Sequence, residues 1–199
     1  MCRFIETIKI EDGKILNLHF HNLRLNATRK DFFGTQTPLL RLEDFITLPV
    51  STECTKCRVV YAEQIEEITY SAYEMRKVNS LKLVYPNAIE YRYKKENRAA
   101  LQKLFAEKGA QDEVLIVRDG LLTDTSIANI ALYDGHEWIT PTHPLLRGTK
   151  RAELLVRKAI READIPADSI FSYSKIALFN AMIDFEALVL TINEGTIFE

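Results

Sequence analysis

The first part of the chain alternates apolar and polar residues in the manner of strands. Phe4 to Ile10 alternates and predicts a strand, which turns at Asp12-Gly13 and returns over Lys14 to Leu18. Three further segments before Pro86 are rich in Val, Ile, Thr and Tyr, and each predicts a strand: RVVYAEQ, EITYSAYE and SLKLVY. Together these segments indicate a β-rich unit.

Apolar residues at helical spacing predict three helices. The first runs from His19 to about Phe33, the second from Lys95 to Lys108, and the third from Lys150 to Ala163. The third has the strongest periodicity of the three. The segment from Leu42 to Leu48 fits either a short helix or a loop. The first helix is expected to cover the β-rich unit.

The end of the chain returns to a strand pattern around one apolar segment, 174–182. Strands are predicted at residues 169–173, 187–192 and 196–199. Pro86-Asn87 interrupts the pattern earlier in the chain, and the boundary between a smaller first domain and a second one is expected there.

The central stretch from Val114 to Arg151 combines strands with polar positions. Asp124 stands among small hydroxyl residues between two predicted strands, and Gly148-Thr149 directly precedes the third helix. Free backbone N–H groups at the start of a helix suit a phosphate. A cofactor with a basic ring nitrogen and a phosphate would use both features. Pyridoxal phosphate (PLP) is such a cofactor, and it also needs a lysine for its aldehyde.

Composition and charge narrow the class of protein. The 199 residues are 47% hydrophobic and 27% charged, which is ordinary for a globular protein with a core. The net charge of −2 gives no basic field, so no nucleic-acid partner is expected. The apolar runs are too short to cross a membrane, and the N-terminus carries charges where a signal peptide needs an apolar core. The sequence therefore predicts a cytoplasmic protein.

The cysteines predict no metal site. Cys54 and Cys57 form a CxxC, but a structural zinc site needs about four ligands, and the chain has no second CxxC to complete one. A redox CxxC is expected to open a helix, whereas this one precedes a predicted strand. Reduced thiols are the interpretation that fits.

Five motifs occur in a specific order: FIETIKIEDGKILNLHFHNLRL, KKENR, TDTSIANI, TPTHPLLRGTKR and LFNAM. Each is weak alone, but their order and spacing resemble the class IV aminotransferases, the PLP fold-type IV group. That group includes branched-chain and D-amino acid aminotransferases and aminodeoxychorismate lyases. The resemblance spans nearly the whole chain. It implies an α/β (α+β) fold with a small α+β domain, residues 1–87, and a larger β-barrel-like domain with outer helices, residues 88–199.

The resemblance also implies roles for three side chains. Lys94 stands three residues before Asn97-Arg98, as does the Schiff-base lysine of the lyases, so it is the expected catalytic residue. Asp124 takes the place of the family's glutamate, which bonds the pyridine nitrogen; aspartate keeps the charge but is one methylene shorter. Arg24, in the run HNLRL, matches the arginine that binds the phosphate.

Other positions are implied at the phosphate through the backbone. Thr149 and Lys150 match the two residues whose N–H groups bind it, and Asn180-Ala181 falls where the family places a small or hydroxyl residue near it. The remaining polar residues of these motifs are expected to be structural: His21 holds the first helix, Asn129 bonds the backbone beside Asp124, and Arg151 pairs with an acid.

The function expected from these residues is PLP chemistry on a small-molecule amino acid substrate. Two reactions remain open: Cβ elimination releasing pyruvate, as in aminodeoxychorismate lyase, or amino transfer to a 2-keto acid. The alternative is a non-catalytic protein of this fold that binds a metabolite or partner. A homodimer is expected from the resemblance. Tyr91, Arg92 and Arg147 are candidates, by position, to hold a substrate carboxylate.

Overall fold

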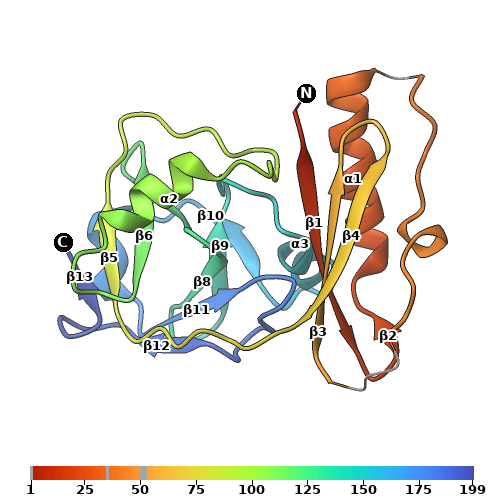
Figure 1. Ribbon diagram of the computed structural model, residues 1–199. Helices are drawn as coiled ribbons and strands as arrows, with labels where there is room; N and C mark the ends of the chain where they lie inside the picture. The colour runs from red at the N-terminus through yellow and green to blue at the C-terminus, as the bar shows by residue number, and fades with distance from the viewer. Residues whose placement is uncertain (1, 35, 50–52) are drawn as a thin grey trace. The chain divides into compact units, whose positions relative to one another are not determined.

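The computed structural model describes residues 2–34, 36–49 and 53–199 (Figure 1). It divides into two compact units. Unit 1 comprises Met1–Met75 and Tyr93–Asn97, and unit 2 comprises Arg76–Arg92 and Arg98–Glu199. Of the helices in the described ranges, none combines the length and hydropathy that crossing a membrane requires.

Unit 1 is a four-stranded antiparallel sheet with one long helix, α1, packed against it (Figure 1). The sheet order is β2-β1-β3-β4. The hairpin turn at Asp12 and Gly13 has positive φ at both residues, as a tight type I′ hairpin requires. The elements are β1 Phe4–Glu11, β2 Lys14–Ile15, α1 Leu18–Phe33, the 3-10 turn η1 Leu42–Asp44, β3 Thr55–Tyr61 and β4 Ile65–Ala72. The predicted opening hairpin and first helix are confirmed.

Residues Tyr93–Asn97 return to unit 1 and lie along its first strand. The N–H of Ile5 donates to the carbonyl oxygen of Lys94 at 2.9 Å, and Phe4 pairs with Lys95 in an antiparallel bridge. The helix predicted from Lys95 therefore begins later. This helix, α2, spans Ala99–Ala106, because the preceding residues pair with β1 instead.

Unit 2 is built on a nine-stranded sheet in the order β10-β9-β8-β7-β6-β5-β13, with β11 paired to β8 and β12 to β11. Helix α2 packs against β6 through a shared apolar core (Figure 1). The elements are β5 Leu81–Val84, β6 Glu113–Arg118, β7 Leu121–Thr125, β8 Asn129–Tyr133, β9 Trp138–Pro141, α3 Thr149–Val156, β10 Arg161–Ala163, the 3-10 helix η2 Ala167–Ser172, β11 Lys175–Phe179, β12 Val189–Thr191 and β13 Ile197–Phe198. The predicted α/β class is confirmed.

The structure differs from the expected division near residue 87. Strand β5 pairs in parallel with β6, Leu81 opposite Glu113, so it belongs to the sheet of unit 2 rather than to the first β-rich unit. The chain divides after Met75, and the first unit regains Tyr93–Asn97.

Two predictions about local structure in unit 2 are wrong. The third helix ends at Val156 and not at Ala163, because Lys158 adopts a positive φ of 56° and residues Arg161–Ala163 pair in parallel with β9. The strand predicted at residues 169–173 is a 3-10 helix, which Pro166 precedes as its N-cap.

Candidate active site

A buried carboxylate organises the polar cluster of unit 1. Glu6 lies on β1 and is fully shielded from solvent. One of its oxygens accepts a hydrogen bond from Arg24 Nε at 2.9 Å. The other accepts from Arg24 Nη2 at 2.5 Å and bonds His21 Nδ1 at 2.6 Å. His21 and Arg24 lie three residues apart on α1, so both face the same side of the helix.

Charge in this cluster is set by its partners. Burial alone would raise the pKa of Glu6, but the positive charge of Arg24 and bonds from Arg24 and His21 lower it to about 2. Burial lowers the pKa of His21; the bond to Glu6 and its negative charge oppose this, while the positive charges of Arg24 and Lys94 act with burial, and the pKa stays below its ordinary value. At neutral pH Glu6 is therefore ionised and His21 neutral, with Nδ1 donating to the carboxylate. Lys94 lies close enough to His21 to be felt electrostatically.

The segment that carries Lys94 is clamped to unit 1 at both sides of the lysine. Glu96 forms ion pairs with Arg3 at 3.0 Å and with Arg58 at 2.8 Å. Before the lysine, the hydroxyl of Tyr93 donates to Asp31 at 2.8 Å. Lys94 itself is half-buried. Two of the residues predicted for the site, Lys94 and Arg24, thus belong to one unit and lie around the same Glu6–His21 pair.

Asp124 forms the centre of a second polar cluster, in unit 2. It lies on β7 and is 4% exposed. Asn129 Nδ2 donates to its Oδ1 at 2.8 Å, and the backbone N–H of Leu146 donates to its Oδ2 at 2.9 Å. Burial raises the pKa of Asp124 to about 6, and the bonds from Leu146 and Asn129 offset this only in part. The carboxylate can therefore exchange or share a proton near neutral pH.

The start of α3 lies against this cluster. Gly148 is the N-cap of α3, and no side chain caps the helix. A Cβ at Gly148 would lie 2.0 Å from Asn129 Oδ1, so only glycine fits against the amide. Asn129 therefore joins Asp124 to the backbone that leads into Thr149 and Lys150. The Lys150 ammonium pairs with Glu153 at 3.0 Å and Asp184 at 3.2 Å, which ties this helix start to the loop after β11.

Asn180 lies at the end of β11 and shapes the loop that follows. Its Oδ1 accepts from the backbone N–H groups of Met182 and Ile183 at 2.8 and 3.0 Å. Its Nδ2 donates to the carbonyl of Ile127, in the turn between β7 and β8, at 3.0 Å. Half-buried Ala181 follows in the same loop. Unit 2 therefore joins strand β7, the start of α3 and the loop after β11 through these bonds, and together they carry five residues predicted for the site: Asp124, Thr149, Lys150, Asn180 and Ala181.

The residues expected to have structural roles make the following contacts. Arg151 pairs with an acid: its Nη2 contacts Glu162 Oε1 at 2.6 Å and the Pro141 carbonyl at 2.7 Å. Asn129 bonds the Asp124 carboxylate itself, as well as the backbone carbonyl of Leu146. Cys2, Cys54 and Cys57 form no disulfide, and burial raises the pKa of Cys57 to about 11, which leaves its thiol unreactive.

Glu6 was not predicted as a site residue, although the residue pattern of β1 contains a signal for it. Side chains two residues apart in a strand face the same side. Glu6 therefore shares its face with Phe4, Ile8 and Ile10, which are all core residues. An acid at an inward position of a strand is the signal that could have marked this buried carboxylate.

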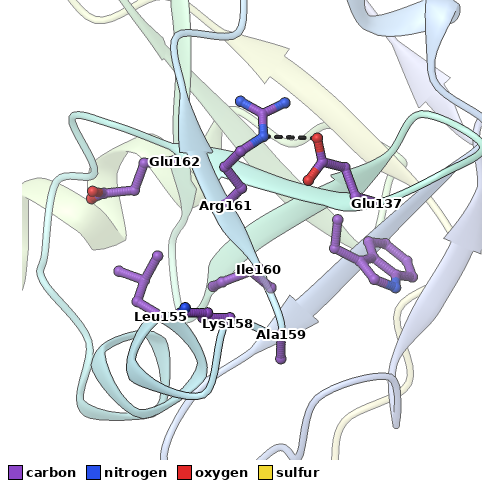
Figure 2. Close-up of a pocket in the computed structure, with 8 residues that line it drawn as sticks. Glu137, Leu155, Lys158, Ala159, Ile160, Arg161 and Glu162 are labelled. Atoms are coloured by element: carbon purple, nitrogen blue, oxygen red, sulfur yellow. Dashed lines mark hydrogen bonds and ion pairs between the residues drawn. The ribbon is translucent and has the colours of Figure 1, made fainter.

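A cavity of about 420 Å³ lies elsewhere in unit 2, at the end of α3 and beside β9 and β10 (Figure 2). Trp138, Leu155 and Ile160 form part of its wall, and an ion pair of 2.8 Å between Arg161 and Glu137 lies at its edge. None of the residues predicted for the site lines it. The chemistry suggested by the sequence therefore does not reside in this cavity.

Comparison with known proteins identifies the family. The family model described as Amino-transferase class IV matches residues 3–185. An uncharacterized protein of Haemophilus influenzae is 34% identical over 185 residues, covering 92% of this chain and 98% of that protein. The chain therefore belongs to the class IV aminotransferase family, whose members are PLP-dependent enzymes. The predicted enzyme class is confirmed, and nothing in the comparisons supports the non-catalytic alternative.

Solved structures agree with this assignment. A protein of Haemophilus somnus, provisionally described as a 4-amino-4-deoxychorismate lyase, is 30% identical and superimposes with a TM-score of 0.86, covering 92% of this chain and 98% of that one. A protein of Mesorhizobium loti, provisionally described as an amino-acid aminotransferase, has a TM-score of 0.79 at 21% identity, covering 97% and 100%. The latter similarity shows the fold alone.

Each cluster, taken by itself, offers groups that would suit one part of PLP. The Asp124 carboxylate, with its raised pKa, suits a basic ring nitrogen with which it would share a proton. The start of α3, which no side chain caps, suits a phosphate. Arg24 offers a guanidinium whose orientation Glu6 fixes through two hydrogen bonds. Lys94 carries a primary amine, the group that the aldehyde of PLP would require.

Proposed function

We propose that this chain binds PLP and acts on an amino acid, with Lys94, Arg24 and the Asp124 cluster as the groups that serve the cofactor. The observation that supports this most directly is the connection, through Asn129, between a buried carboxylate and the start of α3. A ring nitrogen and a phosphate are the two groups that such an arrangement suits.

Each residue then has a defined task. Lys94 Nζ would hold the cofactor through its aldehyde carbon and, when the substrate amine takes that place, would accept the proton from the substrate Cα. Asp124 holds a proton on the ring nitrogen. Arg24 and the backbone N–H groups of Thr149 and Lys150 bind the phosphate, together with the backbone at Asn180-Ala181. When bound, the cofactor supplies an electron-withdrawing ring that stabilises negative charge at Cα.

Covalent trapping tests the role of Lys94. Borohydride reduction of the PLP-loaded protein, followed by peptide mapping, is expected to place the label on Lys94. Lys95 is the nearest competitor, since it follows in the same segment, and Lys82 lies on β5 of unit 2. A label on either of these residues would refute the assignment.

We favour elimination over amino transfer as the reaction. Two observations support this choice: the register of Lys94 ahead of Asn97-Arg98, and the similarity along almost the full length of a relative that is provisionally described as a 4-amino-4-deoxychorismate lyase. After Lys94 removed the Cα proton, a lyase would expel from Cβ the group that becomes pyruvate, and the amine product would then leave as Lys94 takes its place again. A transaminase instead keeps the amino group and needs a keto acid to turn over again.

The two reactions separate in one assay without added keto acid. Incubation with aminodeoxychorismate is expected to release pyruvate over many turnovers. Parallel incubations with D-alanine and with branched-chain amino acids are expected to release none. A single turnover on one of these amino acids, renewed only by a keto acid, would show that amino transfer is the reaction.

We further propose that the protein is a cytoplasmic homodimer. Three cysteines without a disulfide, Cys2, Cys54 and Cys57, support a reducing compartment, and the family resemblance supports the dimer. Light scattering is expected to give twice the chain mass of 22.9 kDa, and a monomer at micromolar concentration would contradict the dimer. Cell fractionation tests the compartment.

A further inference from the structure

Glu6 occupies a position where an apolar residue would be the simpler choice. Its neighbours on the same face of β1 are Phe4, Ile8 and Ile10, and its side chain is fully shielded from solvent. Removing a carboxylate from water is costly, and a buried ion pair is often no more stable than well-packed apolar side chains. A buried acid at this position therefore calls for a reason beyond stability.

The geometry of its bonds provides that reason. Arg24 Nε and Nη2 bond the two different oxygens of Glu6, at 2.9 and 2.5 Å, so the pair is bidentate. A bidentate pair fixes the plane of the guanidinium as well as its position. His21 adds a third bond at 2.6 Å and holds the carboxylate from the same helix. The long, flexible side chain of Arg24 is thus held in one orientation before any ligand arrives.

We propose that Glu6 is a positioning residue that holds Arg24 ready for the phosphate of the cofactor, with His21 as its support. This inference rests on the proposed function, because it takes Arg24 as a phosphate ligand. Glu6 itself touches neither cofactor nor substrate. Its contribution is preorganisation: the ordering of Arg24 is complete before binding, so binding does not have to supply it.

The experiment compares two ligands that differ only in the phosphate. Apoprotein is titrated with PLP and, separately, with pyridoxal, and the ratio of the two dissociation constants gives the preference for the phosphate. In Glu6→Gln this preference is expected to fall roughly tenfold, by analogy with the lower end of the loss seen when the partner that orients a metal ligand is removed. The affinity for pyridoxal is expected to stay unchanged. A general loss of structure would weaken both ligands alike and would overturn the proposal.

Glu43→Gln is the matched control. Glu43 is also an acid bonded to α1, through Asn22 at 2.7 Å, and to an arginine, Arg41, but it lies outside the Glu6 cluster. Its substitution is expected to leave the preference as in the wild type. Should Glu6→Gln fail to fold, Glu6→Asp decides: a reduced preference supports the proposal, and an unchanged preference overturns it.

Arg24→Gln separates this inference from the proposed function. If Arg24→Gln lowers the preference for PLP and folded Glu6→Gln does not, the positioning role is wrong and the phosphate role of Arg24 stands. If the wild type binds PLP no better than pyridoxal, or Arg24→Gln keeps the full preference, the assignment of Arg24 fails, and the positioning role fails with it.

Discussion

Unit 1 and unit 2 each bury one carboxylate in a polar cluster, and the two behave in opposite ways. Glu6 meets an arginine and a histidine, and its pKa falls to about 2 although burial alone would raise it. Asp124 is bonded by an amide and a backbone N–H, and burial raises its pKa to about 6. Burial is common to both, so the charge of the bonded partners decides the ionisation.

The difference also separates two uses of a buried acid. The charge of Glu6 is already matched by Arg24, so Glu6 is suited to hold a cation in place. Asp124 accepts hydrogen bonds from two neutral groups, the amide of Asn129 and the backbone N–H of Leu146. The nearby Arg151 bonds Glu162 and the Pro141 carbonyl. A cation placed against Asp124, such as a protonated ring nitrogen, would be stabilised there. We expect Glu6 to act in binding and Asp124 in the chemical step.

The largest expected effect is on the stability of unit 1. In Glu6→Ala, Arg24 loses its bidentate partner while its side chain stays largely buried, at 15% exposure. Loss of one partner from a buried pair costs about 3–5 kcal/mol, and the free energy of unfolding of the apoprotein is expected to fall by that amount. Urea unfolding measures it. Glu66→Ala, which breaks an exposed pair with Arg3, should cost less than about 1 kcal/mol. Equal losses of unfolding free energy in Glu6→Ala and Glu66→Ala would show that the buried pair stabilises the protein no more than the exposed one.

The next effect is on the rate and belongs to unit 2. Asp124→Ala removes the only charge proposed for the ring nitrogen, and removal of one such preorganised group lowers kcat by about 10²–10³-fold. Asp124→Glu restores the charge and is expected to retain most activity. Both are measured at saturating PLP, where Glu6→Gln should lose much less, because its defect lies in cofactor binding. A larger loss of kcat in Glu6→Gln than in Asp124→Ala would reverse the two roles.

The pH dependence of stability should carry opposite signs for the two acids. The pKa of Glu6 is lowered from 4.5 to about 2, so its contribution is present above about pH 4.5 and is lost as the pH falls towards 2. The pKa of Asp124 is raised from 3.8 to about 6, so its contribution is present below about pH 3.8 and is lost as the pH rises through 6.

Asp124→Asn tests whether Asp124 makes the protein less stable as the pH rises. Between about pH 4 and 7 the wild-type apoprotein should lose about 2–3 kcal/mol of stability through Asp124, since one pKa unit corresponds to about 1.4 kcal/mol. The variant should lack this loss, and exposed Asp119→Asn should follow the wild type. Urea unfolding at several pH values measures the curves. Parallel curves for wild type and Asp124→Asn would show that Asp124 is not perturbed.

The sequence predicts local structure in this protein better than it predicts pairing. The alternation of Phe4 to Ile10 and the helical spacing up to Phe33 are local patterns, and the hairpin and α1 follow them. Two segments departed from their patterns: Lys95, predicted to open a helix, pairs with β1, and Arg161–Ala163 leaves a helical repeat to pair with β9. Both segments pair with strands that are distant in the sequence, and the local pattern of apolar and polar residues carries no information about such partners.

The same limit applies to the site. The environment of Asp124 could be anticipated, because Asn129 is only five residues away and the turn between them is short. The partner of Arg24 could not, because Glu6 lies 18 residues earlier and meets it only when α1 packs on β1. Alternation shows that Glu6 faces inward but does not show which side chain it meets.

The smallest expected effect probes how rigidly unit 2 holds Asp124. Gly148 has φ −67° and ψ 148°, a backbone that any residue adopts, so Gly148→Ala adds only a methyl group. That methyl would lie 2.0 Å from Asn129 Oδ1, and Asn129 must shift away. Overpacking of this kind costs about 1–3 kcal/mol. Because Asn129 helps to lower the pKa of Asp124, its displacement is expected to raise that pKa further.

Gly195→Ala is the matched control for this substitution. Its added Cβ would also face an asparagine side-chain oxygen, that of Asn193, but at 3.1 Å and in an exposed turn where the side chain can give way. Thermal unfolding and the pH dependence of stability are measured for both variants. We expect Gly148→Ala to lose stability and to move the Asp124 transition to higher pH, while Gly195→Ala changes neither. If Gly148→Ala left that transition where it is in the wild type, the bond from Asn129 would not contribute to the pKa of Asp124, and burial together with the N–H of Leu146 would account for it.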